Sequence, residues 1–292
     1  MKSGLVSVVG RPNVGKSTLV NRLVGSKVAI TSTKPQTTRS TIRGVVNGED
    51  YQMVLIDTPG LHRPRAEIGH RLNRMVYGML AEADVVCFLI DAVAPIGPGD
   101  RMIAERLGEV KAPVMVVVNK LDLALPSQVA PQLEEASAWN FAGYFPVSSV
   151  TGEGLEKLVA EVVPRLPEGP ALFPPGMVTD QAEEFLIAEI IREKFLDRLH
   201  DELPHSLIVR VRSMEQEEDL LRIEADVLVE RSSQKGIVIG HRGEMLGTSG
   251  TEARVELEAL FACRVHLQLK VKVEADWQRR PQQLDRLGFP AG

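Results

Sequence analysis

Short runs of almost continuously apolar residues recur along the first 166 residues of the chain, and stretches with helical periodicity separate most of them. The runs cover residues 5–9, 41–46, 51–56, 85–90, 114–118 and 144–147. Strands that are buried on both faces have this character. Their alternation with helices predicts a doubly wound α/β domain with a mostly parallel sheet. The letters "NGED" between the second and third runs are a hairpin signal, so one edge strand should be antiparallel.

The pattern changes after residue 166. Four prolines within "PEGPALFPPG", residues 167–176, prevent regular structure and predict a stiff, Pro/Gly-rich linker. Asp180 then fits a helix N-cap with Glu183 three residues later. The predicted order beyond is helix, strand, strand, helix, helix, strand, ending in "RVHLQLKVKV". We therefore divide the chain into residues 1–166, a linker of residues 167–179, and a smaller α+β domain of residues 180–292.

Composition and charge narrow the class of protein. A chain of 292 residues is long enough for two cores. It has no apolar run of the roughly 18 residues that a membrane helix needs, and its N-terminus fits a first strand better than a signal peptide. Two distant cysteines fit core positions in a reducing compartment, so we expect a cytoplasmic protein. A net charge of −5 argues against a general polyanion binder, so any nucleic-acid contact must be local.

The first candidate chemistry is a phosphate-binding loop. "GRPNVGKS" fits G-x-x-x-x-G-K-[ST], with a predicted strand before it and a predicted helix after it. Backbone N–H groups at such a helix start converge on phosphate oxygens, the lysine reaches the β- and γ-phosphates, and the serine hydroxyl ligates Mg²⁺. The predicted phosphate-binding residues are Gly10, Arg11, Pro12, Asn13, Val14, Gly15, Lys16, Ser17 and Thr18.

The base is indicated by "NKLD", which directly follows the strand at residues 114–118. The carboxylate of Asp122 can accept both N1–H and N2–H of guanine, and adenine offers no such pair of donors. Lys120 can lie along the base plane, and the backbone of "SSV" can donate to guanine O6. The predicted guanine-binding residues are Asn119, Lys120, Asp122, Ser148, Ser149 and Val150.

Two further segments have the character of nucleotide-sensing switches. "DTPG" ends the third predicted strand, and "PQTTRS" precedes the second. A hydroxyl of the latter can ligate Mg²⁺ only while a γ-phosphate is present. The predicted switch residues are Thr37, Thr38, Asp57, Thr58, Pro59 and Gly60, and the predicted Mg²⁺ ligands are Ser17, Thr38 and Asp57.

In these elements the chain resembles the TRAFAC-class GTPases, and "GRPNVGKSTLVNRLVG" followed by "PQTTRS" and "DTPGL" is similar to the bacterial Era family. Leu61 stands where Ras-type GTPases have a water-orienting glutamine, so hydrolysis should be slow or use another group. The resemblance implies that Asn13 holds a K⁺ ion near the β- and γ-phosphates. The alternative is that Asn13 only stabilises the loop turn, and the sequence leaves both open.

A second glycine-bracketed loop, "GHRG", lies between the two adjacent helices of the C-terminal half. With the element order above it resembles a type II KH domain, whose G-x-x-G loop clamps about four nucleotides of single-stranded RNA. Gly247 and Ser249 depart from the family pattern in the helix that follows. The predicted RNA-binding residues are Lys235, Gly240, His241, Arg242, Gly243, Lys270, Lys272, Arg279 and Arg280.

The resemblance covers nearly the whole chain and implies a GTP-hydrolysing switch. It implies binding near the 3′ end of small-subunit ribosomal RNA, a role in 30S subunit assembly, Mg²⁺ as cofactor, and peripheral association with the inner face of the cell membrane. We expect a monomer. The alternative from another class is a GTP-dependent scaffold for protein or membrane partners, with the KH-like domain as a docking platform. A P-loop metabolic kinase is disfavoured by "NKLD".

Overall fold

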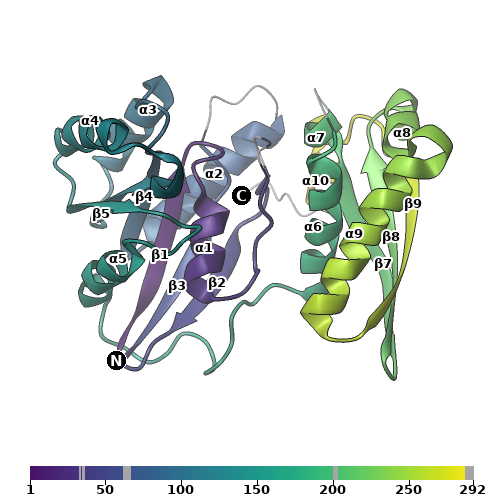
Figure 1. Ribbon diagram of the computed structural model, residues 1–292, viewed down its shortest axis with the longest axis horizontal. Coiled ribbons are helices and arrows are strands. Elements are labelled where there is room, and N and C mark those ends of the chain that lie inside the picture. Colours follow the sequence, from purple (N-terminus) through teal and green to yellow (C-terminus); the bar gives the residue numbers. More distant parts are fainter. Residues whose placement is uncertain (33, 35–36, 62–66, 200–202, 287–292) are drawn as a thin grey trace.

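The computed structural model describes residues 1–32, 34, 37–61, 67–199 and 203–286. Two bodies stand side by side, each built on its own sheet (Figure 1). Three helices lie on the side of the second body that faces the first, namely α6 (Glu183–Leu196), α7 (Leu203–Ser206) and α10 (Pro281–Arg286). Among the described residues, no helix is both long and apolar enough to cross a membrane.

The first body is the predicted α/β domain. Its elements are β1 (Lys2–Gly10), α1 (Lys16–Val24), β2 (Ile42–Asn47), β3 (Tyr51–Asp57), α2 (Glu67–Glu82), β4 (Val85–Asp91), α3 (Pro98–Leu107), β5 (Val114–Asn119), α4 (Pro126–Ser137), β6 (Gly143–Val147) and α5 (Leu155–Val162). The strand order is β2-β3-β1-β4-β5-β6. Only β2 pairs antiparallel within this sheet, through the hairpin that "NGED" predicts.

Both faces of this sheet are buried, as the continuous apolar runs predict. Val8 packs into the cluster under α1 and α5, whereas its neighbour Val9 packs into the cluster under α2, α3 and α4. Successive side chains of a strand point to opposite faces, so a strand between two helical layers needs apolar residues at every position. The polar residues at the carboxyl ends of these strands are thereby left at one edge, where loops converge.

The linker runs along the exposed edge of β2. The Val45 N–H donates to the Val178 carbonyl at 2.8 Å, and the Thr179 hydroxyl donates to the Arg43 carbonyl at 2.7 Å. Asp180 pairs with Arg43 at 2.7 Å. The predicted N-cap at Asp180 is therefore wrong, because this distant ion pair holds the side chain and α6 begins only at Glu183, after Ala182.

The second body has the predicted element order. Its elements are α6 (Glu183–Leu196), α7 (Leu203–Ser206), β7 (Ile208–Glu217), β8 (Leu220–Val229), α8 (Ser232–Ile239), α9 (Glu244–Phe261), β9 (Arg264–Val273) and α10 (Pro281–Arg286). β7 and β8 are antiparallel, and β9 is parallel to β8. Side chains of α6, α8 and α9 form one core with this sheet. The domain boundaries at residues 166 and 179 stay predictions.

Apolar side chains join the bodies at several places, among them Phe185 of α6, which packs against the cluster under α1 and α5. Ile30, from the loop after α1, is buried in the core of the second body. On α2, Ile68 and Leu72 pack with Trp277 and Leu284 from the C-terminal segment. The loop after α1 is thus held by the second body, a point that matters for the nucleotide site.

Candidate functional site

The phosphate-binding loop begins where β1 ends, and its glycines are required by close contacts. A side chain at Gly10 would place Cβ 2.5 Å from the Leu89 carbonyl oxygen, and one at Gly15 would place it 2.2 Å from the Asn119 amide nitrogen. Both residues have positive φ. The Lys16 ammonium donates to the carbonyls of Gly10 and Arg11 at 3.2 and 2.9 Å. Burial lowers the pKa of Lys16 to about 8, against the opposing charge of Asp57.

Three oxygens suited to Mg²⁺ converge beside this loop. The Ser17 hydroxyl donates to Asp57 Oδ2 at 2.7 Å, the Thr38 hydroxyl donates to the same oxygen at 3.2 Å, and the two hydroxyls lie 3.0 Å apart. Asp57 Oδ1 is buried and has no hydrogen-bond partner among the described residues. Burial raises the pKa of Asp57, with Lys16 acting against it. A buried carboxylate with a spare oxygen beside two hydroxyls fits a hard divalent cation, the ligand set predicted from sequence.

The predicted base-binding residues also come together. Asp122 Oδ1 accepts a hydrogen bond from the Ser148 hydroxyl at 2.6 Å, and Lys120 pairs with Asp91 at 2.6 Å. Asn119 has a connecting position: its amide donates to the Val14 carbonyl at 2.8 Å, and its oxygen accepts from the Ser149 N–H at 3.0 Å. Asn119 thus ties the phosphate loop to the "SSV" loop.

A cavity of about 580 Å³ lies over the phosphate-binding loop, and Lys120 is the base-binding residue in its wall. Its walls include most of the predicted phosphate loop together with Thr37, Thr38, Gly60 and Lys120. Asp197, which follows α6 of the second body, is also part of its wall. Sequence reasoning missed Asp197, because nothing in its local sequence distinguishes it from a solvated helix-end carboxylate.

The second switch segment is anchored from both sides. The Thr58 hydroxyl donates to the Val8 carbonyl at 2.8 Å, and Gly60 lies so close to Pro12 that a Cβ would come within 2.8 Å of its nitrogen. Leu61 is only 3% exposed and packs in the apolar cluster under α2, α3 and α4. A leucine in that position cannot orient a water molecule, as the sequence predicts. Pro35 and Gln36 of the first switch lie outside the described residues.

The second glycine loop connects α8 to α9 through one turn of 3-10 helix. Gly240, Arg242 and Gly243 all have positive φ, and His241 and Arg242 are exposed. A Cβ at Gly240 would come within 2.7 Å of the Met245 nitrogen, whereas one at Gly243 would meet open space. The backbone at Gly243 is therefore open to a ligand, which is what a loop that clamps a phosphate backbone needs.

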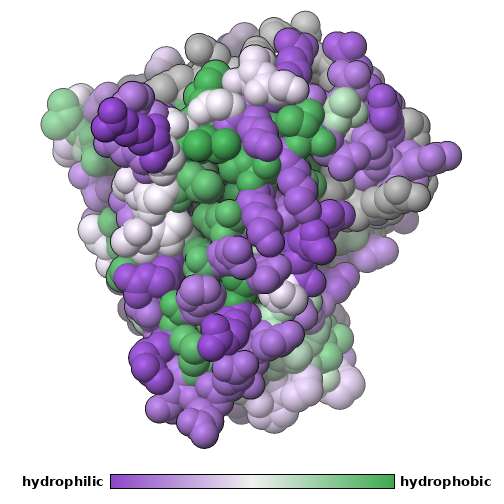
Figure 2. Space-filling view, turned by 90° about the vertical axis from the view of Figure 1, so that its right-hand side faces the viewer, coloured by the Kyte–Doolittle hydropathy of each residue, from purple (hydrophilic) through white to green (hydrophobic). Residues whose placement is uncertain are grey.

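The other predicted RNA residues are distributed over more than one face. Lys235 is exposed on α8, and Arg279 and Arg280 are exposed after β9. Lys270 and Lys272 point to the face of β9 opposite its core residues, where Lys272 pairs with Asp226 at 2.8 Å and Lys270 lies 3.9 Å from Glu224. The side of the molecule with α8, α9 and β9 shows an apolar band between polar side chains (Figure 2). Exposed apolar residues of this body include Ile237, Val255 and Leu260.

Comparison with known proteins assigns a protein family to each half of the chain. Residues 5–120 match the model of the 50S ribosome-binding GTPase family, and residues 202–278 match the KH domain family. The chain is 50% identical to GTPase Era of Mycobacterium tuberculosis (strain H37Rv) over 295 residues, covering 98% of each protein. It is also 50% identical to GTPase Era of a Nocardioides species, covering 99% of this chain and 96% of that protein. The chain belongs to the Era family of GTPases.

Solved Era structures have the same fold. The chain superimposes with a TM-score of 0.95 and 38% identity, over 99% of both chains, on Era in complex with MgGDPNP and nucleotides 1506–1542 of 16S ribosomal RNA. It superimposes with a TM-score of 0.94 and 38% identity on an Aquifex aeolicus Era variant bound to GDP·AlF4⁻, over 99% of this chain and 100% of that one. The predicted family, fold class and GTPase activity are confirmed, and Mg²⁺ with a guanine nucleotide is confirmed as the family's ligand set. The individual site residues stay predictions.

The structure is compatible with both hypotheses for Asn13, the K⁺ ligand and the residue that stabilises the loop turn. Asn13 lines the cavity, which fits a cation ligand, and it has a left-handed φ of 65°, which fits a turn-stabilising asparagine. If Asn13 holds K⁺, exchanging Na⁺ for K⁺ at constant ionic strength should raise the hydrolysis rate on the order of tenfold or more. The Asn13→Ala variant should lose that difference. Equal steady-state hydrolysis rates in both salts for the unchanged protein would contradict the K⁺ hypothesis, and Asn13 would then only stabilise the loop turn.

Proposed function

We propose that the nucleotide site is a guanine-specific switch in which the predicted residues have their assigned roles. Lys16 and the loop N–H groups bind the β- and γ-phosphates, and Asp122 binds the base. Mg²⁺ held by Ser17, Thr38 and Asp57 supplies positive charge to the phosphates when bound. The support is the convergence of three oxygens at Asp57, next to a buried lysine. Thr38 completes this set only while its loop is folded against Asp57, so the state of that loop reports the γ-phosphate.

We propose further that the KH domain binds single-stranded small-subunit ribosomal RNA near its 3′ end. The observation that supports it is the open backbone at Gly243 beside the exposed His241 and Arg242. The relative solved with nucleotides 1506–1542 of 16S ribosomal RNA supports the same partner. The exposed aliphatic side chain of Ile237, three residues before the loop, suits apolar contact with an unpaired base. A few basic groups suit a short strand better than a long duplex.

From the family we propose that the chain assists assembly and maturation of the 30S ribosomal subunit. It acts as a monomer in the cytoplasm, with peripheral association at the inner face of the cell membrane. GTP binding and hydrolysis would set when the RNA is held and released. The division into residues 1–166, 167–179 and 180–292 is part of this proposal, because it assigns one task to each folded half.

Crosslinking with sequencing of the bound RNA tests the proposal directly. We expect reads from the tagged, full-length protein in growing cells to concentrate in the segment equivalent to nucleotides 1506–1542 of 16S ribosomal RNA, the fragment in complex with the solved relative. A tagged Gly243→Asp variant is the control, since it closes the backbone approach. Reads spread evenly over cellular RNA, or equal for the variant, would favour a scaffold function instead.

A further inference from the structure

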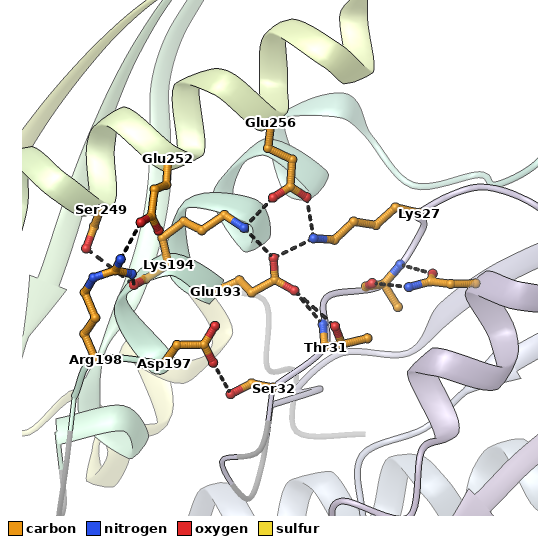
Figure 3. A network of polar contacts seen from close by, with 12 residues as sticks. Lys27, Thr31, Ser32, Glu193, Lys194, Asp197, Arg198, Ser249, Glu252 and Glu256 are labelled. Carbon is orange, nitrogen blue, oxygen red and sulfur yellow. Dashed lines mark hydrogen bonds and ion pairs between the residues drawn. The ribbon is translucent and has the colours of Figure 1, made fainter. Parts of the chain in front are cut away.

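The first switch is held by a helix of the KH domain (Figure 3). The Thr31 N–H donates to Glu193 Oε1 at 2.8 Å, and the Ser32 hydroxyl donates to Asp197 Oδ1 at 3.0 Å. Further along the same loop, the guanidinium of Arg192 donates to the Thr37 carbonyl. These three residues of the KH domain lie on or just after α6, so one helix contacts the loop both at Thr31 and Ser32 and at Thr37.

A ring of four charges reinforces this contact. Lys27, from the loop after α1, pairs with Glu193 at 2.5 Å and also with Glu256 of α9. Lys194 pairs with the same two carboxylates, at 3.2 Å from Glu193. Burial opposes ionisation of Glu256, yet hydrogen bonds from Lys194 and Lys27 outweigh it and lower the pKa of that carboxyl. Each charge therefore has two partners of opposite sign, which fixes α6 and α9 against the nucleotide domain.

Thr38 lies between two contacts to the KH domain. On one side is the bond from Arg192 to the Thr37 carbonyl. On the other side the Arg39 guanidinium donates to the Leu207 carbonyl at 3.0 Å and lies 5.9 Å from the ring centroid of the buried Trp277. A backbone carbonyl held on one side and an arginine side chain held on the other leave Thr38 little freedom, and its hydroxyl lies 3.2 Å from Asp57 Oδ2.

Arg192 is held in the orientation that this contact requires. Its side chain is buried, and Glu189 accepts two hydrogen bonds from it, each of 2.7 Å, from Nε and Nη2. A planar guanidinium whose two nitrogens are held by hydrogen bonds has a fixed orientation. Little conformational entropy is therefore lost when it donates to a further acceptor. The Nη1 of this buried guanidinium already has no hydrogen-bond partner among the described residues, so losing the Thr37 carbonyl as well would cost further free energy.

We propose that Arg192 is a positioning residue for the GTP-bound state: from the KH domain it fixes Thr37, and so holds the Thr38 hydroxyl where Ser17 and Asp57 can share a cation with it. This inference rests on the proposed nucleotide site. The bond exists only while the switch is folded against α6, so it stabilises the state with a γ-phosphate and not the state with GDP. By reciprocity, a bound γ-phosphate fixes the switch and with it the position of α6.

The test compares affinities of the full-length protein for GDP and for GDPNP, a non-hydrolysable GTP analogue, in Mg²⁺. The double variant Glu189→Gln with Arg192→Met removes the buried ion pair together, so no unpaired charge remains to unfold the helix. We expect its preference for GDPNP over GDP to fall roughly tenfold relative to the unchanged protein, as loss of a charged hydrogen bond implies. GDP affinity should not change. The kcat of GTP hydrolysis should fall more than KM rises, and Arg192→Lys should restore part of the loss.

Arg198→Ala is the matched control. This arginine follows α6 and pairs with Glu252 within the KH domain, without touching the switch. Its nucleotide preference should equal that of the unchanged protein. An unchanged GDPNP-to-GDP ratio in the double variant, with a melting temperature matching the control, would overturn the inference alone. Failure of the unchanged protein to bind either nucleotide would overturn the proposed site and this inference together.

Discussion

Asp122→Asn is expected to change the preferred base from guanine to xanthine. In the proposed site the carboxylate accepts N1–H and N2–H of guanine, whereas the amide can donate to the xanthine O2 and cannot accept a second N–H from guanine. Sites built to hydrogen-bond a substrate group reject the mismatched analogue by roughly 10⁴-fold, so the loss of GTP affinity should be of that order. Competition between GTP and XTP for the purified protein measures it.

The surroundings of Asp122 allow this substitution to change base recognition without changing the loop geometry. Its Oδ1 accepts from the Ser148 hydroxyl at 2.6 Å, and an asparagine oxygen can accept the same bond, so the loop geometry is retained. Ser148→Ala is the comparison: it removes that hydroxyl but keeps the carboxylate and the backbone N–H groups of the loop. The preference for GTP over XTP should therefore be retained even where the affinity for GTP falls. A variant Asp122→Asn that still prefers GTP would remove Asp122 from base recognition.

Reversing the charge of the second glycine loop should abolish RNA binding and spare the nucleotide site. In the double variant His241→Asp with Arg242→Asp, two carboxylates occupy the place where we propose that phosphates approach. Both side chains are exposed, so the fold should tolerate the change. Losing two phosphate contacts costs about 3 kcal/mol, or roughly 100-fold in affinity, before repulsion is added. Fluorescence anisotropy with a single-stranded 3′-terminal ribosomal RNA fragment measures the effect.

The same variant should bind GTP with unaltered affinity, because Lys16 and Asp122 lie in the other domain. Arg101→Asp is the control for reversal of one arginine charge, since it reverses an exposed arginine on α3, far in the sequence from the loop. It should bind the RNA normally. If the loop variant, folded by its thermal melt, binds RNA as tightly as this control, the loop is only a turn between α8 and α9.

Local motifs were predictable because the residues that define them are contiguous. The hairpin at "NGED", the glycines of both loops and the final strand, found as Arg264–Val273, all follow from neighbours in sequence. The failures involve partners far away. Asp180 pairs with Arg43 instead of capping α6, and the contact from Arg192 to Thr37 joins two domains. No local pattern encodes such pairs.

The face of β9 on which the two lysines lie could have been predicted from the sequence. Side chains alternate along a strand, so Lys270 and Lys272 must share a face that excludes the buried Val271. Strand alternation alone therefore separates the two lysines from the helical face of the sheet. Their partners, Glu224 and Asp226, could not be foreseen, because they depend on the register between β8 and β9.

The docked linker limits how far the two halves can separate. Bonds from Val45 and Thr179 fasten it to the edge of β2, and α6 begins at Glu183. The three residues from Asp180 to Ala182 can span at most about 10 Å when fully extended. While those bonds hold, the start of α6 therefore stays close to the edge of β2. The RNA-binding half can then rotate about this short linker but cannot diffuse away. Its local concentration near the switch therefore stays high throughout the nucleotide cycle.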